Sequence, residues 1–265
     1  MRPRCLAAFV FCLSLCSITA YAQIPFYTDD ADTTPKGQFH LEMYNEHDLL
    51  EKSDYPAKRQ NTLVLTLNYG LTKNLELGVN APYITLINSR IVESGSVSGQ
   101  GDVQFGAKYK LRDEREKSKL PALAVVFYVE APTGSTRKQL GSGLTDYWLY
   151  GIAQKSFTTR TTARVNGGIL FSGNSSTGLI GIQSVRGHIY TGNMSLVRAF
   201  SDKVNIGAEV FGAVTSNFQL DRGQLTAQVG AQYALTKKWT LTFGVLGGRF
   251  SASPRAGVHL GFSYN

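Results

Sequence analysis

The sequence has little cysteine and little histidine. Its three cysteines are Cys5, Cys12 and Cys16, so a chain that loses its first 22 residues has no thiol. This excludes disulfide crosslinks, thiol redox chemistry and cysteine metal sites. Only four histidines occur in 265 residues, and no serine-hydrolase, zinc-protease or phosphate-loop motif accompanies them. We therefore expect no catalytic residue, no cofactor and no metal site.

Long apolar runs are also missing. Beyond the first 22 residues, no segment reaches the roughly 18 to 20 apolar residues that a membrane-spanning helix requires. The longest run, Leu120–Val129, is shorter and contains Pro121. The hydrophobic share of 43% is therefore spread over many short stretches, which is typical of strands that alternate apolar and polar residues.

Residues 1–22 have the pattern of a secretory signal peptide. Arg2 and Arg4 form a basic start, Leu6–Ile18 is apolar, and the region ends in an A-x-A site at Ala22. We expect export through the secretion translocon, with cleavage after Ala22. The mature chain then has 25 basic and 19 acidic residues, a net charge of about +6. This charge serves solubility or a basic lumen that favours anions, and scattered basic residues in an exported chain argue against nucleic-acid binding.

The mature chain divides into a short lead-in and a long alternating region. Residues 23–36 have turn and acidic character and are predicted as a periplasmic lead-in. Residues 37–265 contain about twelve alternating segments, each near the roughly 9 to 11 residues that cross a bilayer as a tilted strand. The predicted fold is an all-β, antiparallel up-and-down transmembrane β-barrel of about twelve strands. It would close by pairing Gly37–Glu46 with Arg255–Asn265. A soluble exported β-sandwich is the alternative fold.

Aromatic residues recur at one level of the predicted barrel. Each strand that enters a short turn has an aromatic residue near its end, and the last one stands at the end of the chain. An aromatic ring of this kind is typical of a membrane interface. The predicted periplasmic girdle consists of Tyr69, Tyr109, Phe157, Phe200, Tyr233 and Tyr264.

Polar residues opposite the apolar faces are the candidates for a lumen. Unpaired charges are costly in lipid, so they belong in a water-filled or plugged interior. The lumen-lining candidates are His40, Glu42, Glu76, Asn80, Asp102, Gln104, Lys108, Arg164, Asn166, Asn205, Glu209, Gln228 and His259. About twelve strands predict a narrow pore, or one blocked by loops such as Ala131–Leu144 or by the lead-in.

Two smaller features leave alternatives open. His40 and His259 fall on the first and last strands, where they form a polar pair or, as we favour, are unrelated lumen residues. The acidic run Asp29–Asp32 serves turn or capping chemistry, or it binds a divalent cation. The run lacks the glycine and the closing glutamate of an EF-hand.

Several motifs give the chain a family resemblance. They are TDDADTTPKGQFHLEM (28–43), YGLTKNLELGVNAPY (69–83), GQGDVQFGAKYKL (99–111), EAPTG (130–134) and GSGLTDYWL (141–149). In these motifs the chain resembles the bacterial outer-membrane transporters of the meta-pathway of phenol degradation. The resemblance implies a porin-like barrel in a Gram-negative outer membrane, with hydrophobic or aromatic small molecules as cargo. It also implies contact with membrane lipid and the barrel-assembly machinery.

Four functions are therefore compared. The first is a passive channel for small solutes whose lumen charges set selectivity. The second is a structural or adhesive barrel whose lumen is filled by side chains. The third is a lipid hydrolase, which needs a serine beside His40 or His259 on the outer face. The fourth is a soluble sandwich. The alternation points both histidines inward, which favours the channel over the hydrolase.

Overall fold

The computed structural model of the chain describes residues 24–51, 57–88, 95–115, 118–173, 186–215 and 223–265. The expected signal peptide lies outside them. The described residues form one antiparallel sheet and a single short 3₁₀ helix. The elements are β1 (Phe39–Leu49), β2 (Arg59–Gly70), β3 (Leu75–Ile87), β4 (Ser96–Gln100), β5 (Val103–Arg112), β6 (Ala122–Ala131), η1 (Thr136–Lys138), β7 (Asp146–Thr158), β8 (Thr161–Gly173), β9 (Arg186–Ala199), β10 (Val204–Thr215), β11 (Gln224–Ala234), β12 (Trp239–Gly248) and β13 (Ala256–Tyr264).

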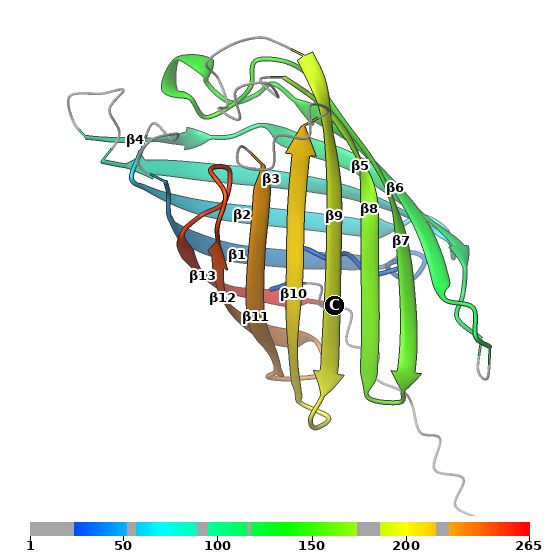
Figure 1. Ribbon diagram of the computed structural model, residues 1–265. Helices are drawn as coiled ribbons and strands as arrows, with labels where there is room; N and C mark the ends of the chain where they lie inside the picture. Colours follow the sequence, from blue (N-terminus) through cyan, green and yellow to red (C-terminus); the bar gives the residue numbers. More distant parts are fainter. Residues whose placement is uncertain (1–23, 52–56, 89–94, 116–117, 174–185, 216–222) are drawn as a thin grey trace, which may run out of the picture.

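The sheet closes on itself as a barrel (Figure 1). β1 pairs with both β2 and β13, so neither end of the sheet is a free edge. β4 and β5 both pair with β3 and together make one stave, which gives twelve staves. This confirms the predicted fold class, and the closed sheet contradicts the soluble sandwich. β1 begins and ends later than the predicted Gly37–Glu46, because Leu49 still pairs with Arg59 and Ala256.

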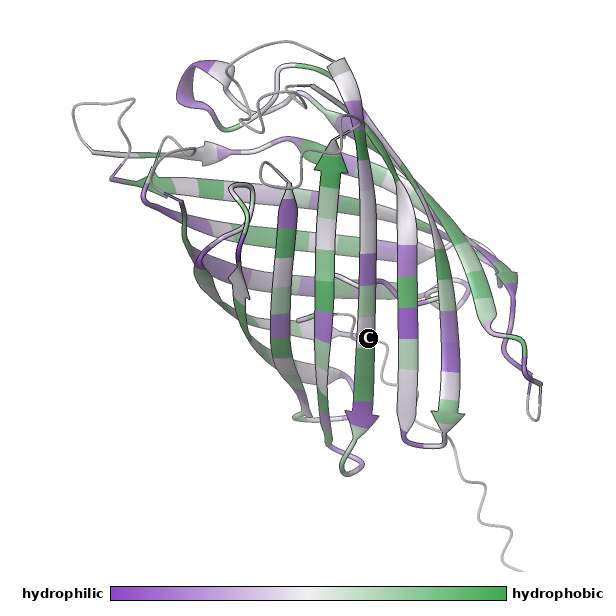
Figure 2. Cartoon of the chain, viewed as in Figure 1, coloured by the Kyte–Doolittle hydropathy of each residue, from purple (hydrophilic) through white to green (hydrophobic). Residues whose placement is uncertain are grey.

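Alternation along each strand separates an apolar outside from a polar inside. In β12, Leu241, Phe243 and Val245 are exposed, whereas Thr240 and Thr242 are buried. Figure 2 shows the same banding of hydrophobic and hydrophilic residues along the strands. A closed barrel satisfies every strand hydrogen bond internally, which lipid requires. None of the helical structure in the described part of the chain is long and apolar enough to span a membrane.

The connections differ in length at the two ends of the barrel. The turns after β2, β7, β9 and β11 are short, spanning residues 71–74, 159–160, 200–203 and 235–238. The short turns after β7 and β9 lie together at the lower end of the barrel in Figure 1. The connection after β6 is longer and contains η1. Longer loops at one end and tight turns at the other are typical of outer-membrane barrels.

Barrel closure predicts a specific crosslink. Asn45 lies directly opposite Leu260 across the β1–β13 pair, and opposed residues in antiparallel strands are close enough for a disulfide. We expect the N45C/L260C variant to form an intramolecular disulfide, seen as a mobility shift that a reductant reverses. The N45C/F243C variant is the matched control, since Phe243 lies opposite Leu260 on the next strand. If the two cysteines of N45C/L260C stayed reduced under oxidising conditions, this result would contradict closure of the barrel.

Candidate functional site

Residues 24–36, called the lumen segment below, run through the barrel interior to the end of β2, where Lys36 bridges Gly70. Thr28 and Ala31 are 0% exposed. The segment contacts inward-facing residues of β3, β5, β7, β10 and β11. These residues were predicted as a periplasmic lead-in, which was also one of the elements expected to block the pore. The structure places them across the lumen, where the barrel wall satisfies polar groups of the segment.

The acidic run of the lumen segment faces a basic part of the wall. Lys108 Nζ on β5 lies 3.0 Å from Asp29 Oδ1 and 3.4 Å from Asp30 Oδ1. It also lies 3.8 Å from Glu76 Oε1 on β3. Arg164 on β8 lies 3.8 Å from Asp30 Oδ2. The Lys108 side chain is 3% exposed, so these pairs act at low dielectric, where charges interact strongly. The acidic run therefore serves ion pairing with the wall.

The residues before the acidic run bind the opposite side of the barrel. Glu209 on β10 accepts hydrogen bonds from the backbone N–H groups of Tyr27 and Thr28, both at 2.9 Å, and from Thr28 Oγ1 at 2.7 Å. The Tyr27 hydroxyl donates to Glu46 Oε2 at 2.5 Å, and its ring packs on Phe211. Hydrogen bonds to an ionised acceptor are the strong class. Glu209 is therefore the second anchor of the lumen segment.

Both ends of the lumen segment are also attached to the wall. Gln228 and Gln232 of β11 donate to the carbonyl oxygens of Pro25 and Ile24, at 2.5 and 2.8 Å. At the other end, Thr34 donates to Glu76 Oε2 through its N–H at 2.6 Å and its hydroxyl at 2.7 Å. The segment thus crosses the lumen from β3 to β11.

Next to this basic part of the wall, the acidic run also meets an apolar part. Ala31 packs against four buried residues of β6 and β7, and Tyr128 and Tyr150 flank this cluster. The Tyr150 hydroxyl donates to Asp29 Oδ2 at 3.0 Å. The Tyr128 ring occupies the space over Gly106, where any Cβ would collide with it. The four buried residues, called the β6–β7 patch below, are Ala122, Ala124, Val126 and Ile152.

The predicted lumen residues are all buried or half-buried. Six of them contact the lumen segment directly: Glu76, Lys108, Arg164, Asn166, Glu209 and Gln228. The Asn166 amide lies against the Asp29 backbone, with its oxygen turned toward the Asp29 N–H at 2.7 Å. The half-buried residues Asn80 and Gln104 bond to one another, and Asn205 donates to Gln232. Buried polar groups need such partners, and these bonds link side chains of neighbouring strands on the inner wall.

His40 and His259 lie on paired strands but do not meet. His40 lies 3.1 Å from Glu42 and 2.5 Å from Asn265. His259 lies opposite Glu46, with its Nδ1 atom 3.6 Å from Glu46 Oε2. Both histidines are at most 4% exposed. They are separate lumen residues.

Five of the six predicted girdle residues lie near the ends of β2, β5, β7, β9 and β11, and the sixth, Tyr264, is the last residue of β13. Tyr109, Phe157, Phe200 and Tyr233 are exposed, and Tyr69 and Tyr264 are half-exposed. Their contact with a membrane interface stays a prediction. Trp239 packs on Tyr264 at 4.8 Å between ring centroids. Its place in the same layer was not recognised from the sequence, because Trp239 opens a strand instead of closing one.

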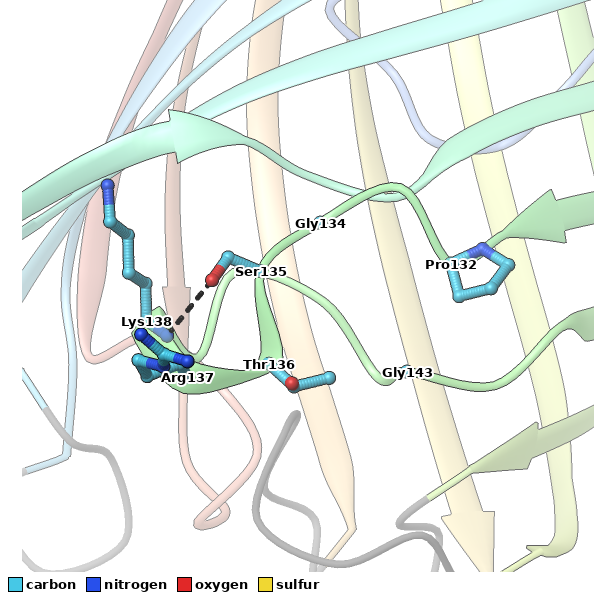
Figure 3. Close-up of a pocket in the computed structure, with 7 residues that line it drawn as sticks. All are labelled: Pro132, Gly134, Ser135, Thr136, Arg137, Lys138 and Gly143. Carbon is cyan, nitrogen blue, oxygen red and sulfur yellow. Dashed lines mark hydrogen bonds between the residues drawn. The ribbon is translucent and has the colours of Figure 1, made fainter.

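Asp102 holds the loop after β6 against the barrel. Its carboxylate accepts from the backbone N–H of Gly134 at 2.8 Å and of Ser142 at 2.7 Å. An open cavity of about 550 Å³ lies in this loop, lined by residues that include Arg137 and Lys138 (Figure 3). Ser135 Oγ accepts from the backbone N–H of Lys138 beside it. The loop therefore presents two cations from a fixed backbone.

The anchoring role of Asp102 gives a testable prediction. D102A leaves two loop N–H groups without their acceptor, and each bond to a charged group contributes roughly 1.5–3 kcal/mol. We expect the amides of Gly134 and Ser142 to exchange hydrogen about tenfold faster or more, measured by hydrogen–deuterium exchange. Exchange in β10 is the internal control. Unchanged exchange at both loop amides would contradict the anchor.

In the turn after β5, the carboxyl group of Glu114 has a shifted pKa. Partial burial of this carboxyl group acts to raise its pKa. The Lys155 ammonium at 2.5 Å and the N–H and hydroxyl of Ser156 outweigh burial and hold that pKa below its usual range. Glu114 is therefore ionised at neutral pH and ties this turn to β7.

No group of three or more histidine, cysteine, aspartate or glutamate residues is placed to hold a metal ion in the part of the chain that the structure covers. Several residues of the site were not singled out from the sequence, above all Tyr27, Thr28, Tyr128 and Tyr150. The acidic run was recognised in the sequence, but its pairing with the inward-facing cations Lys108 and Arg164 was not predicted. Complementary charge between the lead-in and the strands is the signal that would have found the site.

The apolar outside, closed sheet and polar lumen together define a transmembrane β-barrel of the outer-membrane type. A family model described as "Putative MetA-pathway of phenol degradation" matches residues 67–265, and the chain belongs to this family. A comparison with curated proteins gives no significant match.

Solved structures with the same architecture include an outer membrane channel from Pseudomonas putida F1. It has a TM-score of 0.68 and 19% identity, covering 89% of this chain and 97% of that one. The NanC porin has a TM-score of 0.56 and 8% identity, covering 86% and 100%. Outer membrane phospholipase A from Escherichia coli has a TM-score of 0.50 and 15% identity, covering 92% and 94%. At these identities the likeness shows the fold, which channels and an enzyme share.

Proposed function

We propose that the chain is an outer-membrane channel for the passive passage of small solutes, and that the lumen segment closes it. The observation that carries this is a polar inner wall crossed by a segment that is not itself a strand. The segment is held by side-chain contacts at Lys108, Glu209 and Glu76. Side-chain contacts of this kind can be released without breaking the strand ladder.

The cargo is proposed from the family and the wall together. Outer-membrane transporters of this family suggest hydrophobic or aromatic solutes, and Tyr128 and Tyr150 give the wall an aromatic surface beside the apolar β6–β7 patch. Such surfaces bind flat apolar bodies by stacking and burial. We propose no enzymatic role, cofactor or metal, because both candidate histidines face the lumen and not the lipid.

The lipid and biogenesis partners follow from the same proposal. The exposed apolar belt contacts outer-membrane lipid. The barrel-assembly machinery inserts the strands after secretion through the translocon and removal of residues 1–22. The aromatic girdle sits at the periplasmic interface, and the predicted lumen residues line the permeation path.

The test is conductance of the purified barrel in planar bilayers. We expect small, infrequent currents from the full mature chain and severalfold larger currents from a variant that lacks residues 24–34. Heat-shifted migration on an unboiled gel checks that the shortened barrel is folded. A folded variant that passes no current would favour the second function, a structural or adhesive barrel with a filled lumen.

A further inference from the structure

We propose that Lys108 and Arg164, with the β6–β7 patch beside them, form a binding site for a small organic acid with an apolar body. In the structure the lumen segment occupies this site, so such an acid competes with the segment. The inference rests on the proposed channel function, because a solute reaches this wall only through the lumen.

The charge of the site favours one carboxylate. Lys108 and Arg164 are both largely buried, with side chains 3% and 12% exposed. Among the described residues, the wall supplies one carboxylate to Lys108, Glu76 at 3.8 Å, and the lumen segment supplies the other two. When the segment leaves, two cations face one wall carboxylate. The vacated part of the wall then carries a net positive charge, which attracts an anion.

The surroundings of the cations favour an apolar body on that anion. When the lumen segment occupies the site, Asp29 and Asp30 form ion pairs with the two cations, and the Ala31 methyl group covers the β6–β7 patch. The Tyr150 hydroxyl donates to the same Asp29 carboxylate. A benzene ring with one carboxylate reproduces this pattern. Its carboxylate replaces that of Asp29, and its ring covers the patch that Ala31 now covers.

The acid and the lumen segment compete for the same site. Replacing either partner of the Asp30–Lys108 ion pair should therefore change the affinity for the acid, but in opposite directions. D30N weakens the lumen segment but leaves the wall cations intact, so the site is vacant more often and the apparent affinity for an acid rises. K108M also weakens the segment, but it removes the cation that binds the acid. The apparent dissociation constant of a ligand scales inversely with the vacant fraction.

The probe is 4-fluorobenzoate, titrated by fluorine NMR into the purified, detergent-folded mature chain. We expect saturable binding to wild type, about tenfold tighter binding to D30N, and loss of binding to K108M. R112M is the matched control, because Arg112 lies on the same strand and bonds to the Pro121 carbonyl, outside the site. R112M should bind like wild type.

Two further probes separate the charge from the apolar body. 4-Fluorobenzyl alcohol has the ring without the charge, and trifluoroacetate has the charge without the ring, so both should bind much more weakly. Absence of saturable binding in wild type and D30N, or a change in the same direction for D30N and K108M, would overturn the site. Equal binding of trifluoroacetate and fluorobenzoate would overturn the assignment of the apolar body.

The titration and the conductance test fail separately. A shortened barrel that lacks residues 24–34 and carries no current overturns the channel function, whatever the titration shows. A shortened barrel that conducts but does not bind fluorobenzoate keeps the channel function and overturns this site.

Discussion

Replacing Lys108 by methionine is expected to release the lumen segment from the barrel. Lys108 is the cation shared by Asp29, Asp30 and Glu76. Removing it leaves three carboxylates in a buried cluster, and losing one partner of a buried ion pair costs about 3–5 kcal/mol. Undocking the segment rehydrates two of the three carboxylates. The docked population should therefore fall by roughly 10²- to 4 × 10³-fold relative to the undocked one.

Hydrogen–deuterium exchange of the lumen segment and bilayer conductance measure this release. The amides of Thr28 and Thr34 should lose protection in K108M, while those in β10 and β11 stay protected and the current rises severalfold. R112M removes a cation from the same strand without touching the segment, so its exchange and current should match wild type. Full protection of Thr28 in K108M would show that Lys108 does not anchor the segment.

The barrel itself could be predicted because it depends on a local pattern. Residues such as Leu241, Phe243 and Val245 face outward because successive side chains of a strand point to opposite faces. That alternation is visible in the sequence without knowledge of the partner strand. Closure could also be predicted, because an even number of strands returns β13 to the side where β1 begins. The predicted positions of the strand ends were less accurate, as for β1, because the last residue pairs of a strand depend on the neighbouring strands.

The site was harder to predict because it depends on contacts between distant residues. Asp29 lies 79 positions before Lys108, and Thr28 lies 181 before Glu209. The lumen segment has no alternation, so its polar and acidic composition reads as a solvated lead-in. Tyr150 was also ambiguous, because β7 has bulky residues on both faces. Its inward direction follows from the β6–β7 register.

Replacing Glu209, the second anchor, should also open the barrel. The opened barrel should then prefer ions of the opposite sign to those preferred by K108M. In E209L the N–H groups of Tyr27 and Thr28 lose their acceptor, at roughly 1–3 kcal/mol for each buried unsatisfied group. E209Q keeps a carbonyl acceptor and should lie between E209L and wild type. E130Q is the matched control, since Glu130 also faces the lumen but bonds to Gln104.

The two anchors can be distinguished by reversal potential in a salt gradient. K108M removes a positive charge from the lumen and should shift the opened barrel toward cations. E209L removes a negative charge and should shift it toward anions. Both variants should still carry more current than wild type, because each releases the same segment. Shifts of the same sign would mean that lumen charge does not set selectivity. An unchanged current in both would mean that the lumen segment does not limit permeation, since its attachments to Lys108 and Glu209 would each have been removed.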